Sequence, residues 1–348
     1  MAEASVPLAR LRPGWLGLGF GAAAVAILIG ALVGPVALGP GEVLGALADR
    51  VPFVDLESGL SARDSAILFE LRLPRVVLAG LVGATLAVAG AAYQGVFRNP
   101  LADPYLLGAA AGAGLGATLV IAYGPATGSW PIEPLPLAAF AGALAGVGLA
   151  YALGRSAGRA RSSATLILAG VAVAAFFTAI QTYLQQRESD TLREVYSWIL
   201  GGLGTVGWRE VALILPYVLV GGVAIFLHRR LLDVLGVGDE EADSLGVRSA
   251  RVRLVVVAAA SLATAAAVAV SGLIGFVGII VPHTVRLVAG ASYRLVIPLS
   301  MLFGAAFLIL ADTAARTTLA PAEIPIGVVT ALFGAPFFVL VLRRTRRV

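Results

Sequence analysis

The sequence predicts an all-α integral membrane protein with about ten transmembrane helices in a single domain, residues 1–348. Three observations support this fold class: 59% of the 348 residues are hydrophobic, only 13% are charged, and the mean hydropathy is +0.93. A soluble domain carries roughly 25% charged residues, so too little polar surface remains here to face water. Lipid is therefore the expected solvent for most of the surface.

Ten apolar stretches are long enough to cross a bilayer as helices, which takes about 20 residues. The first exceeds the apolar core of a signal peptide, so we expect it to be retained as a span. The eighth is the weakest, because Pro282 and His283 interrupt it, and we expect a broken or partly re-entrant helix there. The predicted spans are residues 15–38, 73–96, 105–123, 135–154, 163–186, 211–227, 253–271, 274–290, 295–315 and 326–342.

The distribution of arginine predicts the orientation in the membrane. With ten spans both ends of the chain lie on the same side, and 17 of the 25 basic residues, all arginine, fall on that side. Cytoplasmic loops are enriched in arginine. We therefore expect both termini in the cytoplasm, and we attribute the net charge of +5 to these loops and not to a nucleic acid partner.

Missing residue types exclude several functions. The chain has no cysteine, so it has no disulfide framework and no thiolate metal site. It has no lysine, and a Walker A loop needs one, so it is not a nucleotide-hydrolysing subunit. His228 and His283 are far apart and no metal site is predicted. No HExxH, GxSxG or aspartate pair lies within a span, so we do not expect an enzyme.

Three connections are too long to be simple turns. The outer connections are residues 39–70, with an amphipathic stretch at Glu42–Arg50, and residues 187–209, with a half-helix expected at about 191–203. The inner connection, residues 228–252, combines an acidic cluster and glycine breakers with an apolar stripe of Leu232, Leu235, Ala242 and Leu245, which predicts two short amphipathic helices. Its apolar face needs a partner, either another protein or the chain's own helix ends and lipid headgroups.

Four segments are more specific than apolar helices: Glu70–Gly108, which contains QGVFRNPLADPYLLG, then Asp239–Val247, Gly272–Leu287 and Ala311–Phe338. Together they resemble the permease subunits of bacterial ABC importers for iron–siderophore complexes, haem and cobalamin. The resemblance covers about residues 70–342, and the motifs occur in the family's order.

This resemblance implies the ABC importer permease fold and a function. The chain would be the transmembrane channel subunit of an ATP-driven importer that moves a bulky metal chelate across the bacterial cytoplasmic membrane. It would work as a homodimer with two ATPase subunits on separate chains, which bind ATP and magnesium, while this chain binds no cofactor. A binding protein outside the membrane would deliver the cargo. The segment LREVYSWILGGLGTVGW resembles cobalamin permeases at least as well as siderophore permeases, so the identity of the chelate stays open.

The resemblance also implies contacts with the ATPase and an inner gate. The gate residues have alternative explanations: the NPLADP loop is a rigid turn between two prolines, and the serines cap a helix. The gate set is Asn99, Leu101, Ser162 and Ser163. The ATPase coupling set is Leu235, Gly238, Asp239, Ala242, Leu245 and Gly246.

Two further sets belong to the outer side and the pathway. Arg72, Arg75 and Arg316 lie at the outer mouth, where the resemblance implies that they receive carboxylates of the binding protein. The alternative is local: lipid phosphates for the first two, and Asp312 four residues before Arg316. A polar stripe on the fifth span would be costly in lipid and is expected to line the pathway, or else to bond neighbouring helices. The stripe is Thr178, Gln181, Thr182 and Gln185.

The main alternative function is an ion-coupled secondary transporter. Such proteins usually carry ionisable residues at the middle of the membrane, and the predicted spans contain almost none. A structural scaffold would not explain the long inner connection.

Overall fold

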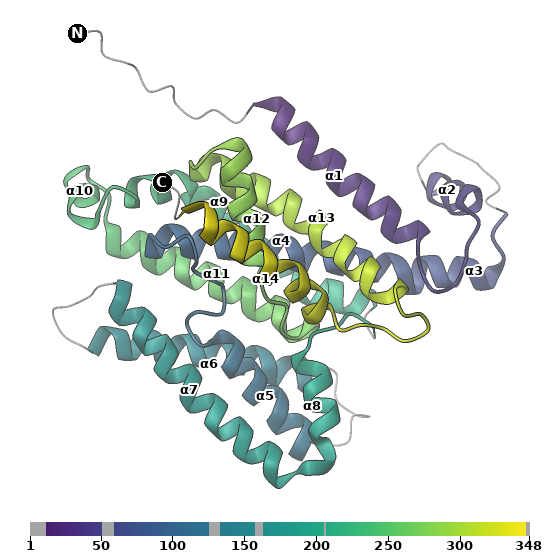
Figure 1. Cartoon of the computed structure of the whole chain (residues 1–348), viewed down its shortest axis with the longest axis horizontal. Coiled ribbons are helices and arrows are strands. Elements are labelled where there is room, and N and C mark those ends of the chain that lie inside the picture. Colours follow the sequence, from purple (N-terminus) through teal and green to yellow (C-terminus); the bar gives the residue numbers. More distant parts are fainter. Residues whose placement is uncertain (1–11, 51–58, 125–132, 157–162, 205–206, 346–348) are drawn as a thin grey trace.

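Helices account for all the regular secondary structure in the computed structural model, which describes residues 12–50, 59–124, 133–156, 163–204 and 207–345. No strand occurs within those ranges (Figure 1). In chain order the elements are α1 (Pro13–Leu32), α2 (Pro40–Asp49), α3 (Ala62–Ala66), the π-helical turn η1 (Ile67–Arg72), α4 (Leu73–Phe97), α5 (Ala109–Tyr123), α6 (Pro134–Ser156), α7 (Ser163–Arg187), the 3-10 turn η2 (Ser189–Thr191), α8 (Leu192–Ile199), α9 (Trp208–Leu235), α10 (Asp239–Ser244), α11 (Ser249–Ser271), α12 (Val277–Ala289), α13 (Tyr293–Thr317) and α14 (Ile326–Thr345).

Each of the ten predicted spans corresponds to one helix, so the predicted all-α membrane fold is confirmed. Among the described residues, seven helices are long and apolar enough to cross a membrane, and three shorter apolar helices complete the set. The half-helix expected after the fifth span is α8, and the amphipathic stretch in the first outer connection is α2. The ten helices are α1, α4, α5, α6, α7, α9, α11, α12, α13 and α14.

The weak eighth span is broken at a different place from the one expected. Pro282 lies inside α12 without ending it. The helical path instead stops at residues 272–276, where Gly272 and Phe276 have φ of 64° and 70°, and α12 begins only at Val277. A helix of 13 residues rises about 20 Å, less than the ~30 Å hydrocarbon core, so the extended segment completes the crossing.

Two helices continue beyond their predicted ends. α3, η1 and α4 form one helical stretch, Ala62–Phe97, of 36 residues, although its first part falls in the predicted outer connection, residues 39–70. At the inner side α9 continues to Leu235, so the inner connection is shorter than the predicted 228–252 and contains one short helix, α10, instead of two. Charged residues ended both predicted spans, but a helix that leaves the bilayer can continue in water.

Three helices form the buried centre of the molecule. In α4, α11 and α13 more than 70% of the most apolar window is buried, against 22% in α1 and α9. Small residues permit this closeness: a Cβ added to Gly83 of α4 would overlap the backbone of Gly304 in α13. Gly112 of α5 meets the backbone of Gly142 in α6 in the same way. These glycines thus let neighbouring helices pack backbone against backbone.

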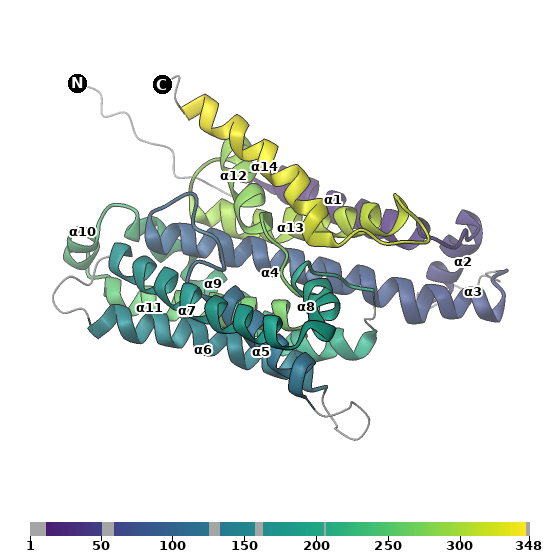
Figure 2. The ribbon, with the colours of Figure 1, turned by 60° about the horizontal axis from the view of Figure 1, so that its bottom comes forward.

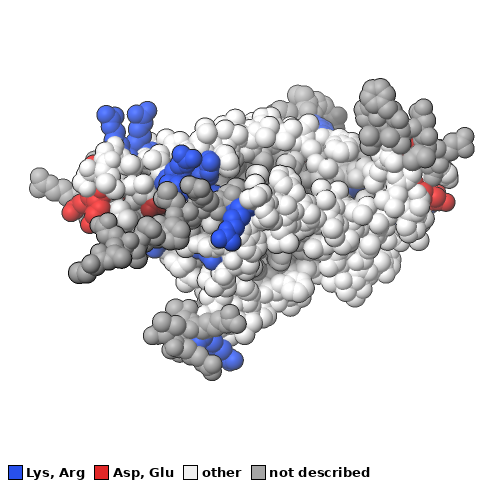
Figure 3. Space-filling model, turned by 90° about the horizontal axis from the view of Figure 1, so that it is seen from above, with Lys and Arg blue, Asp and Glu red and all other residues white. Residues whose placement is uncertain are grey.

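The two ends of the bundle differ in their elements and charge. The start of α1, the end of α14 and the short helix α10 lie toward one end, and α2 and α3 lie at the other (Figures 1 and 2). Figure 3 shows most of the arginines of one face gathered toward the α10 end, followed by a wide uncharged band. We call the α10 end the inner end and the α2 end the outer end.

Candidate transport elements at the two ends of the bundle

Arg72 and Arg316 stabilise the end of α1. Arg72 donates hydrogen bonds to the carbonyl oxygens of Ala31 (3.1 Å), Leu32 (3.2 Å) and Val36, and Arg316 donates one to the carbonyl of Gly30 (2.5 Å). The last carbonyls of a helix have no partner within it and carry partial negative charge, which a cation offsets. Both arginines therefore serve as C-terminal caps of a neighbouring helix.

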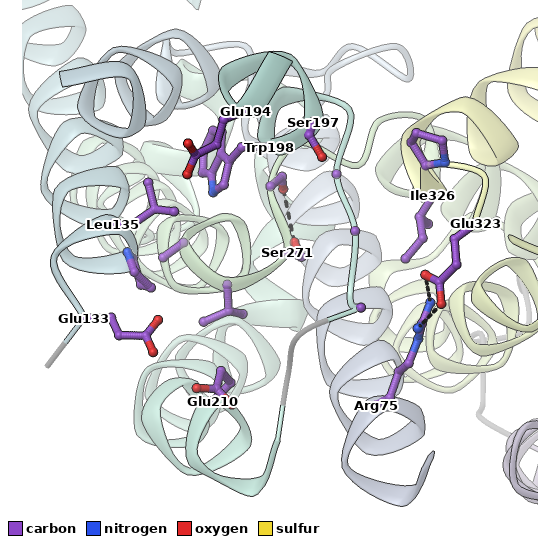
Figure 4. Close-up of a pocket in the computed structure, with 18 of the residues that line it drawn as sticks. Arg75, Glu133, Leu135, Glu194, Ser197, Trp198, Glu210, Ser271, Glu323 and Ile326 are labelled. Atoms are coloured by element: carbon purple, nitrogen blue, oxygen red, sulfur yellow. Dashed lines mark hydrogen bonds and ion pairs between the residues drawn. The ribbon is translucent and has the colours of Figure 1, made fainter. Parts of the chain in front are cut away.

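Arg75 joins three segments through two carboxylates. Its Nε and Nη2 donate to Asp312 of α13 at 2.8–3.1 Å, and its Nη1 and Nη2 donate to Glu323, in the loop before α14, at 2.8 and 2.9 Å. Asp312 also lies 3.7 Å from Arg316. The hydrogen bonds from Arg75 lower the pKa of Glu323 below its ordinary value, so this pair is ionised at neutral pH (Figure 4).

The three arginines expected to receive a binding protein are therefore buried and bonded within the chain. Arg72, Arg75 and Arg316 are only 4%, 8% and 2% exposed. For Arg316 the alternative of local pairing fits, because Asp312 lies 3.7 Å from it. Arg72 contacts carbonyl oxygens at the end of α1 and not the lipid phosphates of the alternative. In this conformation none of the three offers a free guanidinium face to a partner.

A cavity of about 440 Å³ opens beside Arg75 at the outer end. Its lining includes Glu133, Glu194, Glu210 and Glu323, and Figure 4 shows Arg75 with Glu323 at one side and the other three carboxylates across the opening. The loop after α8 forms part of the wall, and α14 is tied to it because the N–H groups of Ile326 and Gly327 donate to carbonyl oxygens of that loop at 3.1 and 3.0 Å. The outer mouth is thus a polar recess in which α8 and the start of α14 are held together.

The polar stripe on α7 is divided between two faces. Thr178 and Thr182 are exposed and line an open groove of about 780 Å³ with Tyr105 and Leu106. Gln181 is 8% exposed, and a Cβ at Gly114 of α5 would meet its amide. The pathway expectation fits the two threonines, whereas Gln181 takes the alternative role of contacting a neighbouring helix. Gln185 is half-buried and is not part of this groove.

The inner loop, residues 98–108, is held by its own polar groups. Arg98 ends α4 in the left-handed conformation, with φ of 51°. The Asn99 side chain accepts the N–H of Leu101 at 2.9 Å, and Asp103 accepts that of Tyr105 at 2.9 Å. Leu101 is exposed at the loop tip. These bonds fix the shape of the turn, and the gating role of Asn99 and Leu101 stays a prediction. Of the other gate residues, Ser162 lies outside the described residues and Ser163 begins α7.

The coupling residues fall into an inward and an outward group. Leu235 and Ala242 are buried in the chain's own core, whereas Leu245 is 69% exposed, as is Val237 at 60%. Part of the predicted apolar face is therefore covered by the chain itself, and the part left for a partner is Val237 and Leu245.

The remaining coupling residues shape the turn around α10. Gly238 and Gly246 have φ of 133° and 82°, conformations that suit glycine, and they bracket the helix. Asp239 accepts two 2.8 Å bonds from Arg253 of α11 and lies 3.6 Å from Arg98. Asp243 accepts the N–H of Ser249 at the start of α11, at 2.9 Å. These contacts hold α10 against the ends of α4 and α11.

These features define a multi-pass membrane permease with a polar outer recess, a groove along α7 and a short helix outside the inner end. The chain belongs to the FecCD transport family, whose model matches residues 22–344.

Individual relatives agree with this membership. The chain is 43% identical over 288 residues to the cobalamin import system permease protein BtuC of Halobacterium salinarum, covering 83% of this chain and 76% of that protein. It is 41% identical over 295 residues to the hemin transport system permease protein HmuU of Yersinia pestis, covering 80% and 84%. A solved structure described as an inward-facing conformation of a metal-chelate type ABC transporter matches with a TM-score of 0.82 and 29% identity, over 96% of this chain and 100% of that one.

Sequence reasoning missed several residues that join these elements. Gln94 was quoted as part of a motif but given no role, and Asp233 and Arg286 were not singled out. Each is a polar side chain near the inner end of a helix, which was the available signal. Their contacts join residues up to 192 positions apart, which no local pattern contains.

Proposed function

We propose that this chain is the transmembrane channel subunit of an ATP-driven importer that moves a bulky metal chelate, such as an iron–siderophore, haem or cobalamin. Two copies form the channel around a two-fold axis, and two ATPase subunits on separate chains supply the energy. ATP and its magnesium belong to those subunits, and this chain performs no covalent chemistry.

The observation that carries this proposal is the match over nearly the whole chain to a metal-chelate type transporter. The cargo class is supported by relatives named for cobalamin and hemin. The lack of any lysine supports the assignment of ATP hydrolysis to another chain, because a Walker A loop requires that residue.

The structure supports a specific arrangement of the partners. The inner end, with α10 and most arginines, faces the bacterial cytoplasm together with both termini, as the arginine distribution favours. The ATPase docks on Val237 and Leu245, whose apolar side chains are exposed there. The binding protein docks over the outer recess, where Arg75 and Glu323 form part of the rim.

Reconstitution tests the proposal directly. The chain, its cognate ATPase subunit and binding protein are placed in proteoliposomes, and uptake of cobalamin, haem and a ferric siderophore is measured. ATP-dependent uptake of at least one chelate is expected, with none when a non-hydrolysable analogue replaces ATP. Uptake driven by a proton or sodium gradient without ATP would instead support a secondary transporter and would reject the proposal.

A further inference from the structure

A series of polar contacts, half-buried at one end and buried at the other, connects the end of α9, just before α10, to the inner loop 98–108. Its centre is Gln94 on α4, which is 1% exposed. The Gln94 amide donates to the carbonyl of Ala102 in the loop (3.2 Å) and to that of Gly278 in α12 (2.9 Å). Its oxygen accepts from Arg286 at 2.6 Å. A side-chain amide offers two N–H groups and one oxygen, so each kind of group in Gln94 is used.

The loop and α12 are in direct contact where Gln94 bonds both. A Cβ at Gly278 would overlap the ring of Pro104, so the loop backbone rests against the first turn of α12. The bonded carbonyl of Ala102 belongs to a fully buried residue. If α12 moves, Gln94 and this contact require the loop to move with it or to lose buried hydrogen bonds, which is unfavourable.

From Arg286 the series continues to the segment that carries α10. Arg286 donates to the Tyr293 hydroxyl at 3.4 Å, and its guanidinium lies 5.5 Å from the Tyr293 ring centre. The N–H of Tyr293 donates to Asp233 at 2.7 Å, and the Ser292 hydroxyl donates to the same carboxylate at 2.8 Å. Asp233 is two residues from the end of α9, and the next helix is α10.

A second contact reaches the same end of α4 across the surface. Asp239, the first residue of α10, lies 3.6 Å from Arg98, which follows the last residue of α4 and begins the loop. An exposed pair of this kind contributes little by itself. It places α10 beside the loop, so the contacts through Gln94 and the surface contact join the same two elements.

We propose that the polar contacts Asp233–Tyr293–Arg286–Gln94–Ala102 transmit movement of α10 to the inner loop, with the buried Gln94 as the positioning residue that ties the loop to α12. This inference rests on the proposed function, since it takes the ATPase as the source of movement at α10. It assigns to Gln94, Arg286 and Asp233 a role in coupling ATP hydrolysis to opening of the inner end.

Gln94→Glu tests the central link. Glutamate keeps an acceptor for Arg286 but has no N–H group for the carbonyls of Ala102 and Gly278, so the loop loses its tie to α12. Because the chain lacks cysteine, Leu101→Cys at the loop tip serves as a single thiol reporter. We expect ATP to change the labelling rate of this thiol in the otherwise unsubstituted complex, and Gln94→Glu to abolish that response. Cargo moved per ATP should fall about fivefold, within the effect of substitutions along coupled networks.

Two further variants separate coupling from stability. Tyr93→Phe removes a neighbouring buried hydrogen bond, from α4 to Ser261 of α11 (2.6 Å), and should leave labelling and coupling unchanged. Asp233→Asn weakens the other end of the series at a half-buried position and should uncouple as Gln94→Glu does, even if the latter assembles poorly. Normal ATP response in both Gln94→Glu and Asp233→Asn, or equal loss in Tyr93→Phe, would overturn the inference.

Absence of chelate uptake by the unsubstituted complex counts against the proposed function alone, because the contacts are judged by the labelling response to ATP.

Discussion

Buried arginines at the outer end show how a charge is accommodated in an apolar bundle without a partner protein. Arg75 has hydrogen bonds from all three guanidinium nitrogens to two carboxylates, and Arg316 combines a helix carbonyl with Asp312. Burying an ion is costly, and only a close counter-charge with satisfied hydrogen bonds offsets that cost. Asp312 is the shared counter-charge, because it lies between two arginines and is 1% exposed.

Replacing Asp312 should therefore destabilise the protein more than replacing Glu323. We expect Asp312→Asn to lower the free energy of unfolding by about 3–5 kcal/mol, the typical cost of leaving a buried charge without its partner. Glu323→Gln is the matched control, because it also removes a carboxylate from Arg75 but at a side chain that is 40% exposed. Thermal unfolding of both variants in the same detergent measures the difference, and equal unfolding temperatures for the two would contradict this account.

At the scale of single residues the sequence predicts local pairs but not distant ones. The spacing of Asp312 and Arg316 was sufficient to suggest their pairing, since four residues span one helical turn. Arg75 and Asp312 are 237 positions apart, so their contact depends on how α4 packs on α13. For that reason the sequence singled out these arginines, but it did not show that their side chains are buried and bonded within the chain.

At the scale of whole elements, the inner connection shows that a sequence pattern can predict a helix but not which of its apolar residues the chain itself buries. Its acidic cluster and glycines predicted two short helices, of which only α10 forms separately, between Gly238 and Gly246, whose backbone conformations other residues resist. The same pattern placed Leu232, Leu235, Ala242 and Leu245 on one apolar stripe. The first three are buried within the chain, whereas Leu245 is exposed. Which residues of an apolar stripe become buried depends on tertiary packing, which the local sequence does not contain.

Leu245, which is exposed directly after α10, allows a sharper test of docking than the buried residues of the inner connection. Leu245→Glu should leave the permease folded, because this side chain contacts solvent over most of its surface, and should weaken ATPase binding by about 1–3 kcal/mol, as for an apolar interface residue. Co-purification and affinity with the cognate ATPase measure this effect. Ala250→Glu, at an exposed position on α11 of the same end, is the control that should bind normally. Normal ATPase affinity in Leu245→Glu would remove α10 from the interface.

At the scale of the whole molecule, ten apolar stretches were enough to predict the ten apolar helices and the all-α class, because lipid requires each span to satisfy its own backbone. Two features could not be read from periodicity, one because it depends on packing within the chain and one because it depends on assembly. The break at residues 272–276 arises from glycine and from Phe276 packing against Gly334 of α14. The groove along α7 is open in a single copy and becomes a pathway only if a second copy faces it.

The division of the α7 stripe provides a test of that assembled pathway. In a homodimer whose channel follows the groove, Thr178 and Thr182 contact water, while Gln181 stays against α5. Because the chain has no native cysteine, Thr178→Cys, Thr182→Cys and Gln181→Cys can each be labelled separately with a charged, membrane-impermeant thiol reagent. We expect the first two to react about tenfold faster than the third, since the thiolate forms readily only where water reaches it. We also expect their rates to change when ATP is added.

If the groove instead faces lipid, all three thiols will be unreactive in every nucleotide state. Rapid reaction at Gln181→Cys alone would show that the other face of α7 lines the channel.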